Sequence, residues 1–261
     1  ISGLLEISID NTAPNAPGTP DLAAGSDSGS SDSDNITSDN TPRFTGTCND
    51  GDKIFLRSSV DGNLDPEDTV CAGGVYDITL TSILSQATHS ITARARDAQF
   101  NTSGDSGGLN VVIDITAPAA PGTPDLASGS DSGSSDADNI TNINTPCFTG
   151  TCENDATVTL NSSVEGTLAP TGTCSGGGFD ITLSSTLSET SHNISAQQVD
   201  AAGNSSGDSG ALGISIDTSA PGAPGTPDLA DGSDTGASNS DNITSDTTPQ
   251  FVGACEDGST V

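Results

Sequence analysis

Acidic and amide side chains recur at fixed places in this chain, in a pattern that suits cation binding. Asp97 and Asn101 lie four residues apart in a predicted turn, and Asp114 ends a predicted strand. Calcium takes about 6 to 8 oxygen ligands, many of them carboxylates and backbone carbonyls on loops. We therefore expect calcium at or near the junctions of repeats, with candidate ligands Asp10, Asp97, Asn101, Asp114, Asp200, Asn204 and Asp217.

The sequence leaves open which of these residues meet. In a β-sandwich, the turn at Asp97 and the strand end at Asp114 can lie a whole strand length apart. In that arrangement the turn faces one neighbouring repeat and the strand end faces the other. A calcium ion at the junction would then draw its ligands from two repeats.

A second acidic cluster is the Ser/Asp loop, residues 27–35, which recurs in the later copies. It lacks the twelve-residue order of an EF-hand, so a metal site there rests on charge density and recurrence. The competing interpretation of both clusters is turn formation, because Asp and Asn also cap their own backbone. The candidate metal ligands of this loop are Asp27, Asp32, Asp34, Asp131, Asp136 and Asp138.

Residues 104–108, Gly-Asp-Ser-Gly-Gly, look like the nucleophile motif of trypsin-like proteases. A catalytic triad needs three groups within mutual reach, and the only histidine upstream of this motif is His89. His89 and His192 begin the same predicted strand in two repeats, and we expect them to be turn or edge residues. The sequence therefore predicts that the chain is not an enzyme.

The elements that must position these residues repeat along the chain. A stretch in which a strand end runs into a proline-rich connector occurs three times, with Asp21, Asp125 and Asp228 at equivalent places. Self-similarity at a fixed period indicates a tandem array. We expect residues 1–10 to be the last strand of a preceding repeat, 11–114 and 115–217 to be complete repeats, and 218–261 to be the truncated start of another.

Within each repeat, apolar residues alternate with polar ones in short runs separated by turn residues. This period of two is typical of half-buried strands, and helical periodicity is not sustained anywhere. The sequence therefore predicts an all-β fold of tandem immunoglobulin-like β-sandwich domains. One departure is Gln198, which falls on the inward face, so we expect a bulge or a register shift near the end of that strand.

The chain has 36 acidic and 5 basic residues, and all the basic ones lie in the first complete repeat. Such a negative field repels phosphate backbones and anionic lipid surfaces. No apolar run approaches the roughly 20 residues needed to cross a membrane. We therefore expect no nucleic-acid binding and no membrane insertion, although high solubility is a simpler explanation of the acidity.

Cysteines recur in pairs, and this pattern predicts the disulfides Cys48–Cys71 and Cys152–Cys174. Disulfides persist in oxidising, extracellular surroundings. A zinc site is the rival interpretation, but there is no CxxC pair and each repeat has one histidine. Cys147 is the odd cysteine, either a free thiol, an intermolecular link or an unremarkable substitution.

Several motifs in a common order resemble bacterial Ig-like repeats, which build the stalks of large RTX-type and biofilm-associated surface adhesins. They are Thr-Pro-x-Phe-Thr-Gly-Thr at 41–47 and 145–151, His-x-Ile-x-Ala at 89–93 and 192–196, Asp-Ala-Ala-Gly-Asn at 200–204, and Ile-Asp-x-Thr-Ala-Pro. The resemblance covers essentially the whole chain. It implies secretion, a cell-surface location and calcium at or near domain junctions.

The favoured hypothesis is a non-catalytic structural extender of a cell-surface adhesin. Its partners would be neighbouring repeats of the same chain, calcium would stiffen the junctions, and the adhesion ligand would bind elsewhere in the parent protein. The alternatives are a glycan- or protein-binding Ig-like module and an accessory stalk of a secreted enzyme. Phe55, predicted to point outward, is the best candidate for sugar or protein contact, but its counterpart in the second repeat is Thr159.

Overall fold

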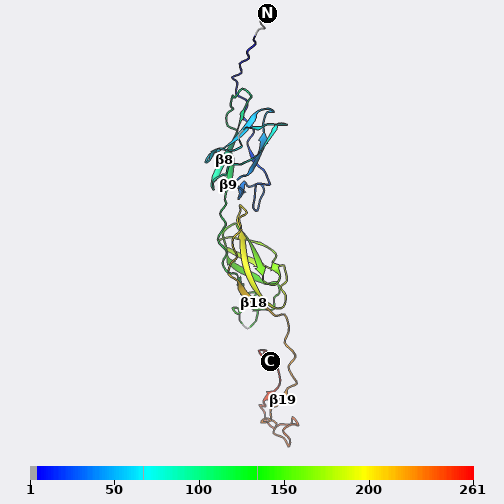
Figure 1. Cartoon of the computed structure of the whole chain (residues 1–261). Helices are drawn as coiled ribbons and strands as arrows, with labels where there is room; N and C mark the ends of the chain where they lie inside the picture. The colour runs from blue at the N-terminus through cyan, green and yellow to red at the C-terminus, as the bar shows by residue number, and fades with distance from the viewer. Residues whose placement is uncertain (1–4, 67, 134) are drawn as a thin grey trace. The chain divides into compact units, whose positions relative to one another are not determined.

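The structure, a computed structural model, describes residues 5–66, 68–133 and 135–261. Within these ranges every regular element is a β-strand, and strands alternate with turns (Figure 1). The chain divides into two compact units, one ending at Ile216 and one from Asp217 to Val261. The described residues include no helix of the length and apolarity needed to cross a bilayer.

The first repeat is a sandwich of two sheets. One sheet has the strand order β1-β3-β7, and the other has the order β2-β9-β8-β4-β5, with β6 also paired to β4. Figure 1 shows β8 and β9 side by side, and they pair antiparallel. The strands are β1 (Asp21–Leu22), β2 (Ile36–Thr37), β3 (Arg43–Thr47), β4 (Lys53–Ser58), β5 (Gly62–Asn63), β6 (Thr69–Val70), β7 (Val75–Thr79), β8 (Thr88–Arg96) and β9 (Leu109–Ile113).

The second repeat has the same topology. Its sheets have the orders β10-β12-β16 and β11-β18-β17-β13-β14, with β15 also paired to β13. In both repeats the strand that leads into the next connector, β9 or β18, pairs in parallel with the short edge strand β2 or β11. The strands are β10 (Asp125–Leu126), β11 (Ile140–Thr141), β12 (Cys147–Thr151), β13 (Thr157–Ser162), β14 (Gly166–Thr167), β15 (Gly172–Thr173), β16 (Gly178–Thr182), β17 (Ser191–Val199) and β18 (Leu212–Ile216).

Each repeat has its own apolar core between the two sheets. The alternating residues of the strands point inward, and Phe44 and Phe148 are fully buried at equivalent places. This arrangement confirms the predicted all-β sandwich and its inward-facing residues. The core of the second repeat consists of Leu126, Phe148, Val158, Leu160, Leu168, Cys174, Phe179, Ile181, Leu183, Leu187, Ile194, Ala196, Ile214 and Ile216.

The bulge expected at Gln198 is absent, and that prediction is wrong. β17 keeps a continuous antiparallel register with β13, in which Gln198 lies opposite Val158. The Gln198 side chain is 2% exposed, and both ends of its amide are hydrogen-bonded. Because its polar atoms have partners, the glutamine can stay on the inward face without distorting the strand.

Both predicted disulfides are present. Cys48–Cys71 and Cys152–Cys174 link the segment after β3 or β12 to the segment before β7 or β16. Cys71 and Cys174 lie in the core, whereas Cys147 is a half-buried free thiol whose Sγ donates to Asp180 Oδ1. The bridges therefore fasten the loops that connect the two sheets of each repeat.

The unit from Asp217 to Val261 contains one strand pair in its described residues. β19 (Asp228–Leu229) pairs antiparallel with β20 (Phe251–Val252), as β1 pairs with β3. Phe251 corresponds to the buried Phe44 and Phe148 but is 65% exposed. Within this unit Phe251 has no second sheet to pack against.

We predict that replacing Cys152 and Cys174 together by Ser lowers the free energy of unfolding of the second repeat by about 3 kcal/mol. The bridge closes a loop of 22 residues, and removing it increases the conformational entropy of the unfolded chain. Urea denaturation followed by circular dichroism measures the change. Cys147→Ser is the control and should leave the transition in place; an unchanged transition in the double variant would contradict the prediction.

Candidate functional site

The junction turn, residues 200–204, follows β17 and is closed by its own side chains. Asp200 Oδ1 accepts a hydrogen bond from the Asn204 backbone N–H at 2.9 Å, and Asp200 Oδ2 accepts one from Asn204 Nδ2 at 3.0 Å. Gly203 has a φ of +91°, a conformation that glycine adopts without strain. Turn chemistry therefore accounts for the recurring Asp and Asn at these two positions.

The same turn contacts the end of the first repeat. Asn204 Nδ2 also donates to the backbone carbonyl of Asp114 at 2.8 Å, just after β9 ends. The first repeat has the matching contact, in which Asn101 Nδ2 donates to the carbonyl of Asp10 at 3.2 Å. The strand end at Asp114 is thus joined to the turn of the second repeat. In the same way, the segment at Asp10 is joined to the turn of the first repeat, which contains Asn101.

The connector that follows Asp114 is held against the second repeat. Gln198 Nε2 donates to the carbonyl of Ala119 at 2.7 Å, while Gln198 Oε1 accepts from the Glu153 backbone N–H at 2.9 Å. Gly122 N–H also donates to the carbonyl of Thr151. This role of Gln198 was not predicted, because its only signal in the sequence is an amide side chain at an inward-facing position.

A second contact, which we call the seam, joins the first repeat to the junction turn. Ser28 Oγ donates to the carbonyl of Ala202 at 2.6 Å, and the Ser38 backbone N–H donates to the same oxygen at 3.2 Å. A Cβ on Gly29 would lie 1.9 Å from the carbonyl oxygen of Ala201, so a glycine is required there. The seam residues were not predicted, because nothing in the sequence shows which repeat they contact.

The corresponding turn of the first repeat, residues 97–101, differs at two positions, one of which is Gln99 in place of Ala202. Phe100 stands where the second repeat has Gly203, with a φ of +68° and 74% of its surface exposed. The Arg96 guanidinium lies 5.6 Å from the centroid of the Phe100 ring and 6.0 Å from that of Phe55. Phe55 itself is half-buried beside this arginine, which reduces the ring surface available for a glycan or a protein.

The predicted junction ligands do not form a ready metal cage. Asp114 Oδ1 accepts from the Thr116 backbone N–H and from Gln86 Nε2, and both Asp200 oxygens accept from Asn204. Asp217 Oδ1 likewise accepts from the Ser219 N–H within the second unit. Among the described residues, no three His, Cys, Asp or Glu side chains form a group that could hold a metal ion.

The Ser/Asp loop contains a buried carboxylate in each copy. Asp27 is 6% exposed, and its Oδ2 accepts from the Asn35 backbone N–H at 3.1 Å, whereas its Oδ1 has no hydrogen-bond partner. Burial raises the pKa of Asp27, and the charges of Asp34 and Asp32 raise it further, against the lowering effect of the Asn35 N–H. Asp32 and Asp34 are exposed, as are Asp136 and Asp138 in the second copy.

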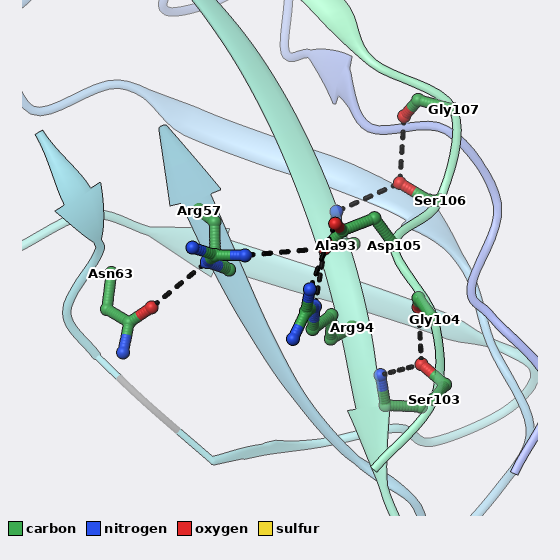
Figure 2. Close-up of polar contacts among 10 residues, drawn as sticks. Arg57, Asn63, Ala93, Arg94, Ser103, Gly104, Asp105, Ser106 and Gly107 are labelled. Carbon is green, nitrogen blue, oxygen red and sulfur yellow. Dashed lines mark hydrogen bonds and ion pairs between the residues drawn. The ribbon is translucent and has the colours of Figure 1, made fainter. Parts of the chain in front are cut away.

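Figure 2 shows why the protease-like motif at 104–108 is structural. Ser106 Oγ donates to the carbonyl of Gly107 at 2.8 Å and accepts from the Ala93 N–H at 2.9 Å. Ser103 Oγ likewise accepts from the Ala95 N–H and donates to the carbonyl of Gly104. Ser206 and Ser209 make the corresponding bonds in the second repeat. These hydroxyls accept hydrogen bonds from backbone N–H groups of β8 and β17 at positions where no neighbouring strand pairs with them.

The charged contacts in Figure 2 belong to the first repeat alone. Asp105 forms ion pairs with Arg94 and Arg57, and Arg57 also donates to Asn63. The hydrogen bond from Arg94 holds the pKa of Asp105 below its usual range. The second repeat keeps the acid as Asp208 but has Gln197 in place of Arg94, so this network is not part of the repeated design.

The two histidines lie inside the repeats, so the expectation of turn or edge residues is wrong. His192 is 2% exposed; its Nδ1 lies 3.1 Å from Ser162 Oγ and 3.0 Å from Glu165 Oε2, and its Nε2 lies 2.9 Å from the Ser188 carbonyl. His89 has equivalent partners in Ser58, Asp61 and Ser85. A serine, a histidine and an acid thus meet in each repeat, but the imidazole is enclosed and both of its nitrogens have partners.

Comparison with known protein families identifies the family of this chain. A model described as bacterial Ig-like domain matches residues 13–115, 117–218 and 221–261. The chain belongs to this family. Bacterial Ig-like repeats therefore occupy almost its whole length, in agreement with the sandwich fold. No curated protein matches the chain in sequence.

Solved structures similar to these bacterial Ig-like repeats share little sequence with them. Fibronectin(III)-like modules of Clostridium thermocellum CbhA are 12% identical with a TM-score of 0.39, covering 69% of this chain and 88% of theirs. The BSP domain of a biofilm-associated protein is 15% identical with a TM-score of 0.28, covering 78% and 30%. The chicken CNTN1 FN1-FN3 domains are 12% identical with a TM-score of 0.39, covering 80% and 70%.

We predict that Glu165→Gln lowers the stability of the second repeat at neutral pH by about 1.5 to 3 kcal/mol, the usual worth of hydrogen bonds to a charged group. Burial raises the pKa of Glu165, but the hydrogen bonds from Ser162 and Ser188 and the charge of His192 outweigh it and hold the pKa at about 2. Because the folded pKa lies below the unfolded one, this stabilisation is present above about pH 4.5 and is lost as the pH falls through 2.

Thermal unfolding measured from pH 7 to pH 2 tests this dependence. The difference between the wild type and Glu165→Gln should be largest at neutral pH and should vanish near pH 2. Glu153→Gln makes the same change at an exposed carboxylate and serves as the control. A difference that stays constant across the whole range would refute the role of the Glu165 charge.

Proposed function

We propose that this chain is a set of non-catalytic spacer repeats of a secreted cell-surface adhesin. The observation that carries the proposal is the hydrogen-bonded link between the two complete repeats. Asn204 binds the end of β9, Gln198 binds the connector, and Ser28 binds the junction turn. Such contacts limit the bending of one repeat against the next, which is the property that a spacer requires.

The remaining features of the chain agree with this role. The serine motif that suggested catalysis serves backbone hydrogen bonding, and the histidine and serine of each Ser-His-acid group are buried within the repeats. Disulfides in both repeats suit an oxidising, extracellular location. A surface with many more acids than bases favours solubility and disfavours nucleic acid or anionic lipid as a partner.

Calcium at the junctions is the second part of the proposal. Supporting it, the turn that contains Asp200 meets the strand end at Asp114, so acidic residues of consecutive repeats lie on the two sides of one junction. When bound there, calcium would supply positive charge between the two repeats. The carboxylates of Asp114 and Asp200 would then bind calcium in addition to accepting hydrogen bonds within their turns. In the absence of calcium, the seam would still hold the two repeats together.

We predict that the distance between the two repeats is narrowly distributed even in EGTA. Electron spin resonance on the 261-residue chain, with spin labels at Thr81→Cys and Ser184→Cys, measures that distribution. The two free cysteines, Cys147 and the exposed Cys255, are replaced by Ser so that they take no label. Both label sites are exposed. Ser28→Ala should broaden the distribution, because it removes the bond to the Ala202 carbonyl.

Ser132→Ala is the matched control for this experiment. Ser132 makes the corresponding bonds to Thr141 and Asn142 inside its own repeat, so its loss tests the loop without touching the seam. A distribution that is broad in EGTA and narrow only with millimolar calcium would assign the stiffness to the cation. A distribution that is broad under both conditions would refute the spacer proposal.

A further inference from the structure

The buried aspartate of the Ser/Asp loop has one oxygen that no group in the protein satisfies. In the second repeat this residue is Asp131, which is 7% exposed. Its Oδ2 accepts from the Asn139 backbone N–H at 3.1 Å, and its Oδ1 is buried without a hydrogen-bond partner. A buried carboxylate oxygen without a donor from the protein is costly unless a group from outside the chain completes it.

The same arrangement occurs in all three copies of the loop. Asp27 and Asp234 are each 6% exposed, each accepts the backbone N–H eight residues further on, and each has an unpartnered Oδ1. The third copy lies in the separate unit from Asp217 to Val261, so the feature does not depend on the contact between repeats. Its recurrence indicates that something outside the protein chain completes this group.

The surroundings of Asp131 restrict what that partner can be. Residues 115–217 contain no lysine or arginine, so no basic side chain of this repeat can pair with the carboxylate. In the first repeat the basic side chains pair with other acids: Asp68, Asp77 and Asp105. The partner of the buried oxygen must therefore come from solution, as a cation, a proton or a water molecule.

The loop also provides space and further oxygen atoms. Asp131 lines a hollow of about 430 Å³ together with Asp125, Asp136, Asn139 and Ser128. Asp125 and Asp136 are exposed, so they can turn toward an ion without loss of buried contacts. All of these side chains offer oxygen, and none offers the sulfur or imidazole nitrogen that zinc prefers.

We propose that each Ser/Asp loop binds one hard divalent cation, of the calcium class, with the free Oδ1 of Asp27, Asp131 or Asp234 as its anchoring ligand. No three acidic side chains converge among the described residues, so the other ligands are backbone and side-chain oxygens and water. Calcium accepts such mixed sets with irregular geometry, whereas magnesium requires a near-ideal octahedron. With few charged ligands, the affinity should lie near the 10⁻⁴ to 10⁻³ M that is typical of extracellular modules.

The candidate ligands around Asp131 all belong to one repeat. Around Asp27, in contrast, Ser28 and Gly29 of the same loop contact the junction turn, so the test uses the second copy. The buried loop carboxylates also differ from Asp114 and Asp200 at the junction, because each junction carboxylate oxygen described above already accepts a hydrogen bond. Binding at the loop would link Asp131 to exposed oxygen-bearing side chains of the same repeat, such as Asp136. The proposal therefore stands or falls independently of the spacer function.

Isothermal titration of the metal-free 261-residue chain with CaCl₂ tests the site. We expect Asp131→Asn to bind one calcium equivalent fewer than the wild type, because its amide places a donor where the ion needs an acceptor. Asp136→Asn leaves the bond between Asp131 and Asn139 intact and should weaken that equivalent about tenfold or more. Asp208→Asn, which changes an exposed acid of the same repeat, is the control and should bind as the wild type does.

The thermal unfolding of the same proteins separates a cation from a proton. If a cation completes the group, millimolar calcium raises the unfolding temperature of the wild type and of Asp208→Asn, and raises it less for Asp131→Asn. If a proton or a water molecule completes the group instead, Asp131→Asn binds as much calcium as the wild type. In the case of a proton, Asp131→Asn is also as stable as the wild type in EGTA. Either outcome would overturn the proposal.

Discussion

The junction between the complete repeats depends on one turn of five residues. Asp200 and Asn204 close the turn by bonding to each other, and the closed turn then has one side-chain N–H and one backbone carbonyl available. The N–H binds the carbonyl of Asp114, and the carbonyl of Ala202 accepts from Ser28. The hydrogen bonds that close this turn therefore also position the two groups that link the repeats.

Small polar side chains provide many of the hydrogen bonds that stabilise this fold. The core of each repeat is modest, and hydroxyl groups occupy places where a strand lacks a neighbour, as Ser106 does beside Ala93. The enclosed His192, held by Ser162, Glu165 and the Ser188 carbonyl, continues this pattern within the sandwich. Groups that look catalytic in a list of residue types are here the means by which buried polar atoms are satisfied.

The acidity of the chain has more than one physical origin. Asp200 and Asp114 act as acceptors for backbone and amide N–H groups in turns. Glu165 is a half-buried partner of the enclosed His192, and Asp105 is paired with arginines in the first repeat only. Asp131 differs from all of these, because one of its oxygens is buried without a donor. Acids therefore recur at fixed positions for several reasons. Some form turns, some pair with buried or basic groups, and Asp131 has the unsatisfied oxygen on which the cation proposal rests.

The sequence alone determined the properties that depend on local order. The alternation around Phe148, the cysteine pairs and the period of the repeats follow from neighbours along the chain, and the all-β sandwich and both disulfides agree with them. Only the tertiary structure decided that Gln198 and His192 are buried with partners, that Asp114 faces the turn of the next repeat, and that Asp131 has one unpaired oxygen. These outcomes depend on groups distant in sequence, and the burial and hydrogen bonding of a polar side chain are known only once those groups have been brought to it.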